Sequence, residues 1–240
     1  MAMARAYLAP YGVGLGHASR LLSISERLKK DNITIKFSSY GEAVSYINNH
    51  GYECVEVPPI EFAWGKSGFS IMNSIANIPL WLTNFARQLS QETKNISSFN
   101  PGIVVSDSRL SPLVTSKFLD VPSIVILNQI KLLLSPRIRE FKVARIFENL
   151  NGEFFGSVWS MAEKLLIPDL PPPYTIAEHN IWNLESAKKK MHYIGFTTSK
   201  WHEDKQAINR VMHSLHLDKN KPIVFMHISG PYETRLDLIS

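Results

Sequence analysis

Short apolar runs alternate along this chain with longer stretches of helical periodicity, and this alternation limits the fold more than any other feature. The expected strands are 6–9, 33–37, 52–57, 103–106, 123–127, 164–167, 192–194 and 223–227. The expected helices are 19–30, 42–50, 112–119 and 204–215. Strands that alternate with helices form βαβ units, and runs that are apolar throughout indicate a sheet covered on both faces. We therefore predict an α/β fold with a doubly wound, parallel, Rossmann-like sheet.

Two breaks divide the sequence. Four prolines between Pro168 and Pro173 make a rigid connection that no helix can cross. A second break lies near residues 197–203, and the helix and strand that follow it lead into a turn at Ser229-Gly230-Pro231. That pattern indicates the start of another α/β unit close to the last residue. We predict a complete domain over residues 1–197, then a linker and the truncated start of a second Rossmann-like domain over residues 198–240.

Composition excludes several classes of protein. A single cysteine rules out an internal disulfide and a four-cysteine zinc site. No run of 18 apolar residues and no signal peptide is visible, so we expect a cytoplasmic protein, with the inner face of the membrane as an alternative. The net charge of +5 favours anionic partners, such as phosphates or an acidic lipid surface. No recognition motif or dense basic stripe points to nucleic acid, so we expect no nucleic-acid partner.

A glycine-rich segment, Tyr11-Gly12-Val13-Gly14-Leu15-Gly16-His17, follows the first expected strand and opens the first helix. Glycines let the backbone turn sharply and approach a ligand, and a helix N-terminus attracts anions. A tight turn in any doubly wound sheet would look the same. A dinucleotide fingerprint requires glycine where His17 stands and an acidic residue where Ser38-Ser39 stand, so NAD is not expected.

His17 and Asp107 are the candidate catalytic residues. In the common doubly wound strand order the first and fourth strands are neighbours, and ligands bind at their carboxyl ends. His17 follows the first strand and Asp107 follows the fourth. A carboxylate bonded to one ring nitrogen would fix the imidazole tautomer and leave the other nitrogen free to accept a proton. The ordinary alternatives are a structural histidine and an aspartate that caps the following helix.

These motifs resemble a known group. Gly14-x-Gly16-His17 is similar to the N-terminal loop of GT-B nucleotide-sugar glycosyltransferases, nearest to the branch of the peptidoglycan N-acetylglucosaminyltransferase. Val104-Val105-Ser106-Asp107 resembles the strand that carries the aspartate of a His–Asp dyad in plant and antibiotic glycosyltransferases. Residues 121–129 resemble the next strand and its acceptor-side loop, and residues 222–230 resemble the first strand and donor-side loop of the second domain. This sequence departs from that branch at Leu127-Asn128-Gln129, where the peptidoglycan enzyme has Glu-Gln-Asn.

The resemblance implies a hexosyltransferase with an acceptor domain and a donor domain across a cleft. His17 would remove the proton of an acceptor hydroxyl, and Asp107 would orient His17. The residues implied in substrate binding are Gly12, Gly14, Gly16, Ser108, Asn128 and Gln129, and those implied in donor binding are Ser229 and Gly230. The partners implied are a nucleotide-sugar donor, such as a UDP-sugar, and a hydroxyl acceptor. No Asp-x-Asp motif occurs, so we expect no metal and no cofactor.

Membrane contact and other functions stay open at this point. Residues 71–89 are rich in apolar side chains, and residues 131–145 hold five basic residues and one acidic residue. They fit either an anionic membrane surface near a lipid-linked acceptor or core helices, since a helical wheel over 138–150 has no clean amphipathic face. The alternatives to a transferase are a non-catalytic half that recruits a donor-binding subunit and a sugar-nucleotide epimerase. A homo-oligomer or a donor-domain partner is a further expectation, and this chain alone is expected to be inactive.

Overall fold

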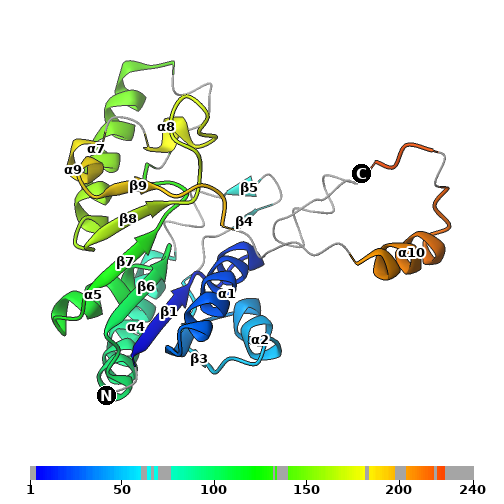
Figure 1. The fold of residues 1–240 in the computed structure, drawn as a ribbon. Coiled ribbons are helices and arrows are strands. Elements are labelled where there is room, and N and C mark those ends of the chain that lie inside the picture. Colours follow the sequence, from blue (N-terminus) through cyan, green and yellow to red (C-terminus); the bar gives the residue numbers. More distant parts are fainter. Residues whose placement is uncertain are drawn as a thin grey trace.

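A seven-stranded sheet forms the centre of the molecule (Figure 1). The computed structural model describes residues 4–60, 64–65, 68–69, 77–131, 133, 140–181, 184–197, 204–218 and 221–224. The strands are all parallel and lie in the order β3-β2-β1-β6-β7-β8-β9. Their bounds are β1 (Arg5–Pro10), β2 (Thr34–Ser39), β3 (Cys54–Glu56), β6 (Ile103–Asp107), β7 (Ser123–Ile126), β8 (Lys164–Ile167) and β9 (Met191–Tyr193). The predicted α/β class and doubly wound parallel sheet are confirmed.

Helices cover both faces of this sheet. Their bounds are α1 (Leu15–Lys30), α2 (Glu42–Asn49), α4 (Ile78–Phe99), α5 (Leu110–Phe118), α7 (Lys142–Trp159), α8 (Glu178–Ile181), α9 (Glu185–Lys188) and α10 (Lys205–Ser214). Alternate residues of β1 face opposite layers, since Leu8 packs with α1 and α2 whereas Tyr7 packs with α4. A third cluster joins β7 and β8 to α5, α7 and α9. A short antiparallel pair, β4 (Trp64–Gly65) and β5 (Gly68–Phe69), stands apart from the sheet.

The strand order reverses between β1 and β6. From β1 the chain steps outward through β2 to β3, and from β6 it steps in the other direction through β7 to β9. Pro10, the last residue of β1, is paired in register with Asp107, the last residue of β6. Loops that leave two such strands diverge onto opposite faces, and the space between them is where open α/β sheets bind ligands.

Several element boundaries differ from the sequence prediction. Helix α1 begins at Leu15 rather than Ser19, because Gly14 adopts a left-handed φ of 74° and lets the chain enter the helix at once. Helix α4 is not among the helices expected from the sequence, and a proline at position 79 normally argues against a helix interior. In the structure Pro79 stands in the first turn, where a proline is tolerated. None of the helices in the described ranges is both long and apolar enough to span a membrane.

The second domain is hardly represented among the described residues. Helix α10 confirms the helix expected over 204–215 and has no buried residue. Ile223 and Val224 lie in irregular chain, so the start of the strand expected over 223–227 is not seen there. The rest of that strand, together with Ser229 and Gly230, lies outside the described residues. The division into residues 1–197 and 198–240 stays a prediction.

Candidate functional site

The two predicted catalytic residues meet at the strand reversal. His17 Nδ1 lies 2.7 Å from Asp107 Oδ1. The Asp107 side chain is fully buried, whereas the His17 side chain keeps 22% of its surface exposed. A carboxylate only accepts hydrogen bonds, so Nδ1 carries a proton in this contact, and the neutral form of the ring has its lone pair on Nε2. The helix that follows β6 has Arg109 at its N-cap and no side-chain cap, so Asp107 is not the capping residue of that helix.

Asp107 is also bonded to two other side chains. Arg20 Nη1 donates to Asp107 Oδ2 at 2.8 Å, and Ser108 Oγ donates to Asp107 Oδ1 at 3.2 Å. Arg20 lies one helical turn after His17 on α1, so both residues reach the same carboxylate from one face of the helix. The guanidinium compensates the buried negative charge on the oxygen that His17 leaves unused.

The chain after Asp107 turns sharply. Ser108 has a φ of 60°, a left-handed value that is uncommon for a residue other than glycine. The turn is closed by Ser106 Oγ, which donates to the Arg109 carbonyl at 2.5 Å and accepts from the Arg109 N–H at 3.2 Å. On the other strand, the Tyr11 N–H donates to the Asp107 carbonyl at 2.9 Å, so the two strand ends remain joined. These contacts fix the Asp107 backbone on both sides.

The glycine loop packs tightly at one position and is open at two. A Cβ on Gly12 would overlap the ring and the carbonyl oxygen of Tyr40. Around Gly14 and Gly16 there is nothing within 4 Å of an added Cβ. Gly12 is therefore required by packing, Gly14 by its positive φ, and Gly16 by neither. Tyr11 lies edge-on against His17 and Tyr40, with both ring centroids 5.6 Å away.

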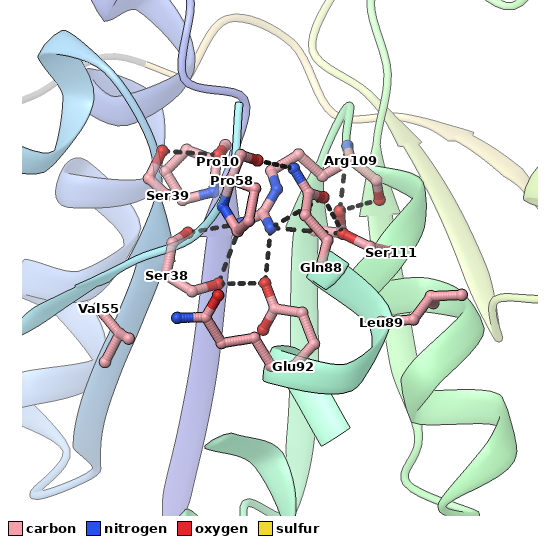
Figure 2. Close-up of polar contacts among 12 residues, drawn as sticks. Pro10, Ser38, Ser39, Val55, Pro58, Gln88, Leu89, Glu92, Arg109 and Ser111 are labelled. Carbon is pink, nitrogen blue, oxygen red and sulfur yellow. Dashed lines mark hydrogen bonds and ion pairs between the residues drawn. The ribbon is translucent and has the colours of Figure 1, made fainter. Parts of the chain in front are cut away.

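A buried polar network surrounds Arg109, two residues after Asp107 (Figure 2). Arg109 Nη2 lies 2.6 Å from Glu92 Oε1, and both side chains are almost completely buried. Arg109 Nη1 donates to the Ser38 carbonyl at 2.7 Å, and Ser38 Oγ donates to Glu92 Oε1 at 2.8 Å. The network thus ties the end of β2 to α4 and to the turn after β6. An NAD-binding fold carries an acidic residue at the end of β2. Here that position is held by Ser38 and Ser39, which are buried and whose hydroxyls bond to groups within the protein.

The same network extends to β1, and neighbouring side chains bond to the segment after β3. Tyr7 of β1 donates through its hydroxyl to Glu92 Oε2 at 2.5 Å. Gln88 Nε2 donates to the Pro58 carbonyl at 2.5 Å, and Tyr40 donates to the Ile60 carbonyl at 2.9 Å. Burial, followed by the charge of Glu92, raises the pKa of Tyr7, and burial, followed by the neighbouring Tyr11, raises the pKa of Tyr40. Both phenols are therefore neutral donors over the physiological pH range.

The remaining predicted binding residues are distributed along the same edge. Asn128 and Gln129 follow β7 and are exposed, and Gln129 Oε1 accepts a bond from Asn180 at 3.2 Å. No contact is recorded between them and the dyad in the described part of the chain. Among the described residues, no group of three or more His, Cys, Asp or Glu side chains could hold a metal ion. Their roles in binding substrate and the absence of a metal stay predictions.

Sequence reasoning missed Arg20 and the Arg109–Glu92 pair. The signal for Arg20 was available, because a residue three positions after His17 on a helix shares its face. Arg109 stands two residues after Asp107, but its partner Glu92 lies on a helix whose bounds were not predicted. Nothing local in the sequence marks Glu92 as buried.

Known proteins were compared with the chain. No protein-family model matches it. Two curated proteins, from Methanosarcina mazei and Methanosarcina acetivorans, are each named "Uncharacterized glycosyltransferase" and are 30% identical to it over 200 and 199 residues. Each match covers 82% of this chain and 52% of the relative. The chain thus spans about half the length of the curated relatives it matches.

Two solved glycosyltransferase structures share its fold. MurG of Acinetobacter baumannii superposes with a TM-score of 0.50 and 7% identity, over 84% of this chain and 47% of that chain. The spinosyn forosaminyltransferase SpnP superposes with a TM-score of 0.50 and 12% identity, over 85% of this chain and 54% of that chain. These identities are evidence for the fold alone. The predicted resemblance to GT-B glycosyltransferases is confirmed: the fold matches these structures, and the sequence relatives are named glycosyltransferases.

Proposed function

We propose that this chain is the acceptor-side part of a GT-B glycosyltransferase, and that His17 is its catalytic base. The observation that carries the proposal is the 2.7 Å contact between His17 Nδ1 and Asp107 Oδ1 at the reversal of the strand order. The names of the sequence relatives and the fold support the same class of enzyme. The substrates proposed are a nucleotide-diphosphate sugar, such as a UDP-sugar, and an acceptor that carries a hydroxyl group, which could be lipid-linked.

The reaction follows from the position of the free ring nitrogen. Nε2 of His17 takes the proton of the acceptor hydroxyl while the oxygen of that hydroxyl forms a bond to the anomeric carbon of the sugar. The bond from that carbon to the diphosphate breaks, and the nucleoside diphosphate leaves with the electron pair. A single displacement of this kind inverts the anomeric configuration. General base catalysis contributes typically ~10²–10⁴-fold to the rate.

Asp107 and Arg20 have supporting roles in this proposal. Asp107 holds the ring in the tautomer that exposes Nε2 and stabilises the imidazolium formed when the proton arrives. Arg20 occupies the second carboxylate oxygen at 2.8 Å and so keeps Asp107 from rotating away from His17. The backbone N–H groups at the start of α1, beside Gly14 and Gly16, face the same edge and favour a negatively charged group there.

The experiment uses the complete protein rather than the 240-residue chain. Transfer from radiolabelled UDP-N-acetylglucosamine and UDP-glucose to a total lipid extract of the native host is measured for wild type and His17→Ala. We expect the variant to lose transfer by ~10²–10⁴-fold while its unfolding midpoint in urea is unchanged. His50→Ala is the matched control, because His50 is exposed at the end of α2, at the opposite edge of the sheet.

Three outcomes would contradict the proposal. His17→Ala with near-normal transfer would remove the catalytic role of the dyad. Conversion of UDP-N-acetylglucosamine to an epimer without any acceptor would favour an epimerase of the same architecture. A complete protein that transfers sugar only after addition of a separate donor-binding subunit would favour the non-catalytic half.

A further inference from the structure

Helix α7 exposes a continuous stripe of large apolar side chains. This α7 stripe consists of Val143, Ile146, Phe147, Leu150 and Phe154. Their exposed fractions run from 50% at Phe147 to 77% at Val143. The spacing of i, i+3, i+4, i+7 and i+11 places all five within one sector of the helix surface. The stripe corrects the expectation, drawn from a wheel over 138–150, that no clean face exists: that window began four residues before the helix.

The opposite face of α7 is the one that packs on the protein. Its buried residues are Ala144, Glu148, Gly152 and Gly156. A Cβ on Gly152 would press on Lys131 and Leu184, and a Cβ on Gly156 would overlap the hydroxyl of Ser186. The helix meets its own domain through these residues and, near its C-terminal end, through Phe155 and Trp159. The five stripe residues lie on the other side of the helix and stay exposed.

The size of the stripe is that of a protein interface. Five large side chains at half to three-quarters exposure present roughly 600 Å² of apolar surface, at the upper end of what a monomer leaves uncovered. Standard interfaces bury about 800 Å² on each partner. Packing of the stripe and its immediate surroundings against a second protein surface would therefore reach the area that a stable pair of subunits requires.

The pattern of the stripe is self-complementary. Val143, Phe147, Leu150 and Phe154 follow each other at intervals of four, three and four residues, which is the a/d pattern of a coiled coil. A two-fold axis between residues 148 and 149 pairs residue i of one copy with residue 297 − i of the other. Phe147 then meets Leu150 of the second copy, and Val143 meets Phe154, so each phenylalanine faces a smaller side chain. We propose that the α7 stripe binds the α7 stripe of a second copy of this chain in an antiparallel, two-fold symmetric pair.

The charges on α7 fit this arrangement better than they fit a lipid surface. The exposed basic residues Lys142 and Arg145 both lie in the first turns of the helix, and the last turn has no basic residue. An antiparallel pair places these cations beside the carbonyl end of the partner helix, where positive charge is favourable. A helix lying on an anionic membrane would instead carry basic residues along the whole length of its polar face.

The mass in solution of the complete protein, as used in the transfer assay, tests the proposal directly. Sedimentation velocity at about 50 μM is expected to give twice the mass of one polypeptide. Leu150→Lys places a charged ammonium group against the apolar ring of Phe147 of the second copy on each side of the two-fold axis, and we expect it to raise the dissociation constant at least 10-fold. The matched control is Phe118→Lys on α5, because Phe118 is 80% exposed and lies outside the stripe. Far-UV circular dichroism and urea unfolding of all three proteins check that the fold is retained.

Two further measurements separate the alternatives. In a Cys54→Ser background, an oxidised mixture of Phe147→Cys and Leu150→Cys chains should form the mixed disulfide in preference to either symmetric one. Preferred Phe147→Cys homodimers would overturn the antiparallel register. A monomeric wild-type chain would overturn the proposal, and so would a chain that binds phosphatidylcholine–phosphatidylserine vesicles through the stripe but remains monomeric without them. This inference does not depend on the transferase reaction, because the two tests use different residues and different readouts.

Discussion

Removal of the Glu92 carboxylate should destabilise the fold more than any surface substitution. Glu92 accepts hydrogen bonds from Arg109 Nη2, Ser38 Oγ and the Tyr7 hydroxyl at 2.6, 2.8 and 2.5 Å. In Glu92→Ala, the Arg109 guanidinium remains in an environment where it is only 3% exposed, with no charge to balance it. Breaking a buried pair in this way costs about 3–5 kcal/mol. For a chain of this size each kcal/mol lowers Tm by roughly 2–4 °C, so we expect a fall of about 6–20 °C.

A double-mutant cycle tests whether the pair itself is responsible. Arg109→Met alone should also cost about 3–5 kcal/mol, because it leaves Glu92 as the unpaired charge. The double variant Glu92→Ala/Arg109→Met leaves no buried charge, so its cost should be smaller than the sum of the two single costs by at least about 1.5 kcal/mol. Glu92→Gln keeps the hydrogen-bond partners and should be milder than Glu92→Ala.

The assay is urea unfolding at pH 7, followed by far-UV circular dichroism. Glu185→Ala is the control, since the Lys188–Glu185 pair is 3.3 Å long but 69% and 77% exposed, and its loss should change stability by less than about 0.5 kcal/mol. Single variants at Glu92 and Arg109 that each cost under about 1 kcal/mol would refute the reasoning. Additive costs in the double variant would show that the two charges do not depend on each other.

Three other perturbations have defined outcomes. Burial raises the pKa of the Asp169 carboxyl, but hydrogen bonds from Thr175 Oγ1 and three backbone N–H groups outweigh it and leave the pKa below its ordinary value. Its stabilising contribution is therefore present above the ordinary carboxyl range and lost as the pH falls through the lowered pKa, so Asp169→Asn should flatten the acid side of a plot of urea midpoint against pH. Burial raises the pKa of Cys54 to about 12, so its reaction with a disulfide reagent at pH 8 should be at least about 100-fold slower than in urea. Gly12→Ala should cost about 1–3 kcal/mol through overlap with Tyr40, as measured by urea unfolding against wild type.

Local features made the centre of the site predictable from the sequence. His17 and Asp107 each follow an apolar strand directly, and the reversal of strand order brings the ends of those strands together. The choice between a dyad and a helix cap for Asp107 depended on where the next helix begins. The structure places that start at Leu110 with Arg109 as the capping residue, which no sequence pattern had specified.

Long-range packing accounts for what could not be predicted. Helix α4 begins at Ile78 with Pro79 in its first turn, and its bounds were not predicted from the sequence. Without those bounds, the contact between Glu92 and Arg109 could not be predicted. On α7 the expected apolar pattern was spread around the wheel because the window included residues that precede Lys142. With the helix bounds known, the residues of α7 separate into a buried face that includes Ala144, Glu148, Gly152 and Gly156 and an exposed apolar stripe.

The bonds that Asp107 makes to His17 and Arg20 both originate from one turn of α1. A shift of that helix by a single residue is a translation of about 1.5 Å and a rotation of about 100°, which would break both bonds together. The geometry of the proposed dyad therefore depends on how α1 packs on the sheet. Ala18 and Leu21 are fully buried beside that turn and help to fix this packing. We expect substitutions at these two positions to move His17 and Arg20 together relative to Asp107, although neither position bonds to Asp107.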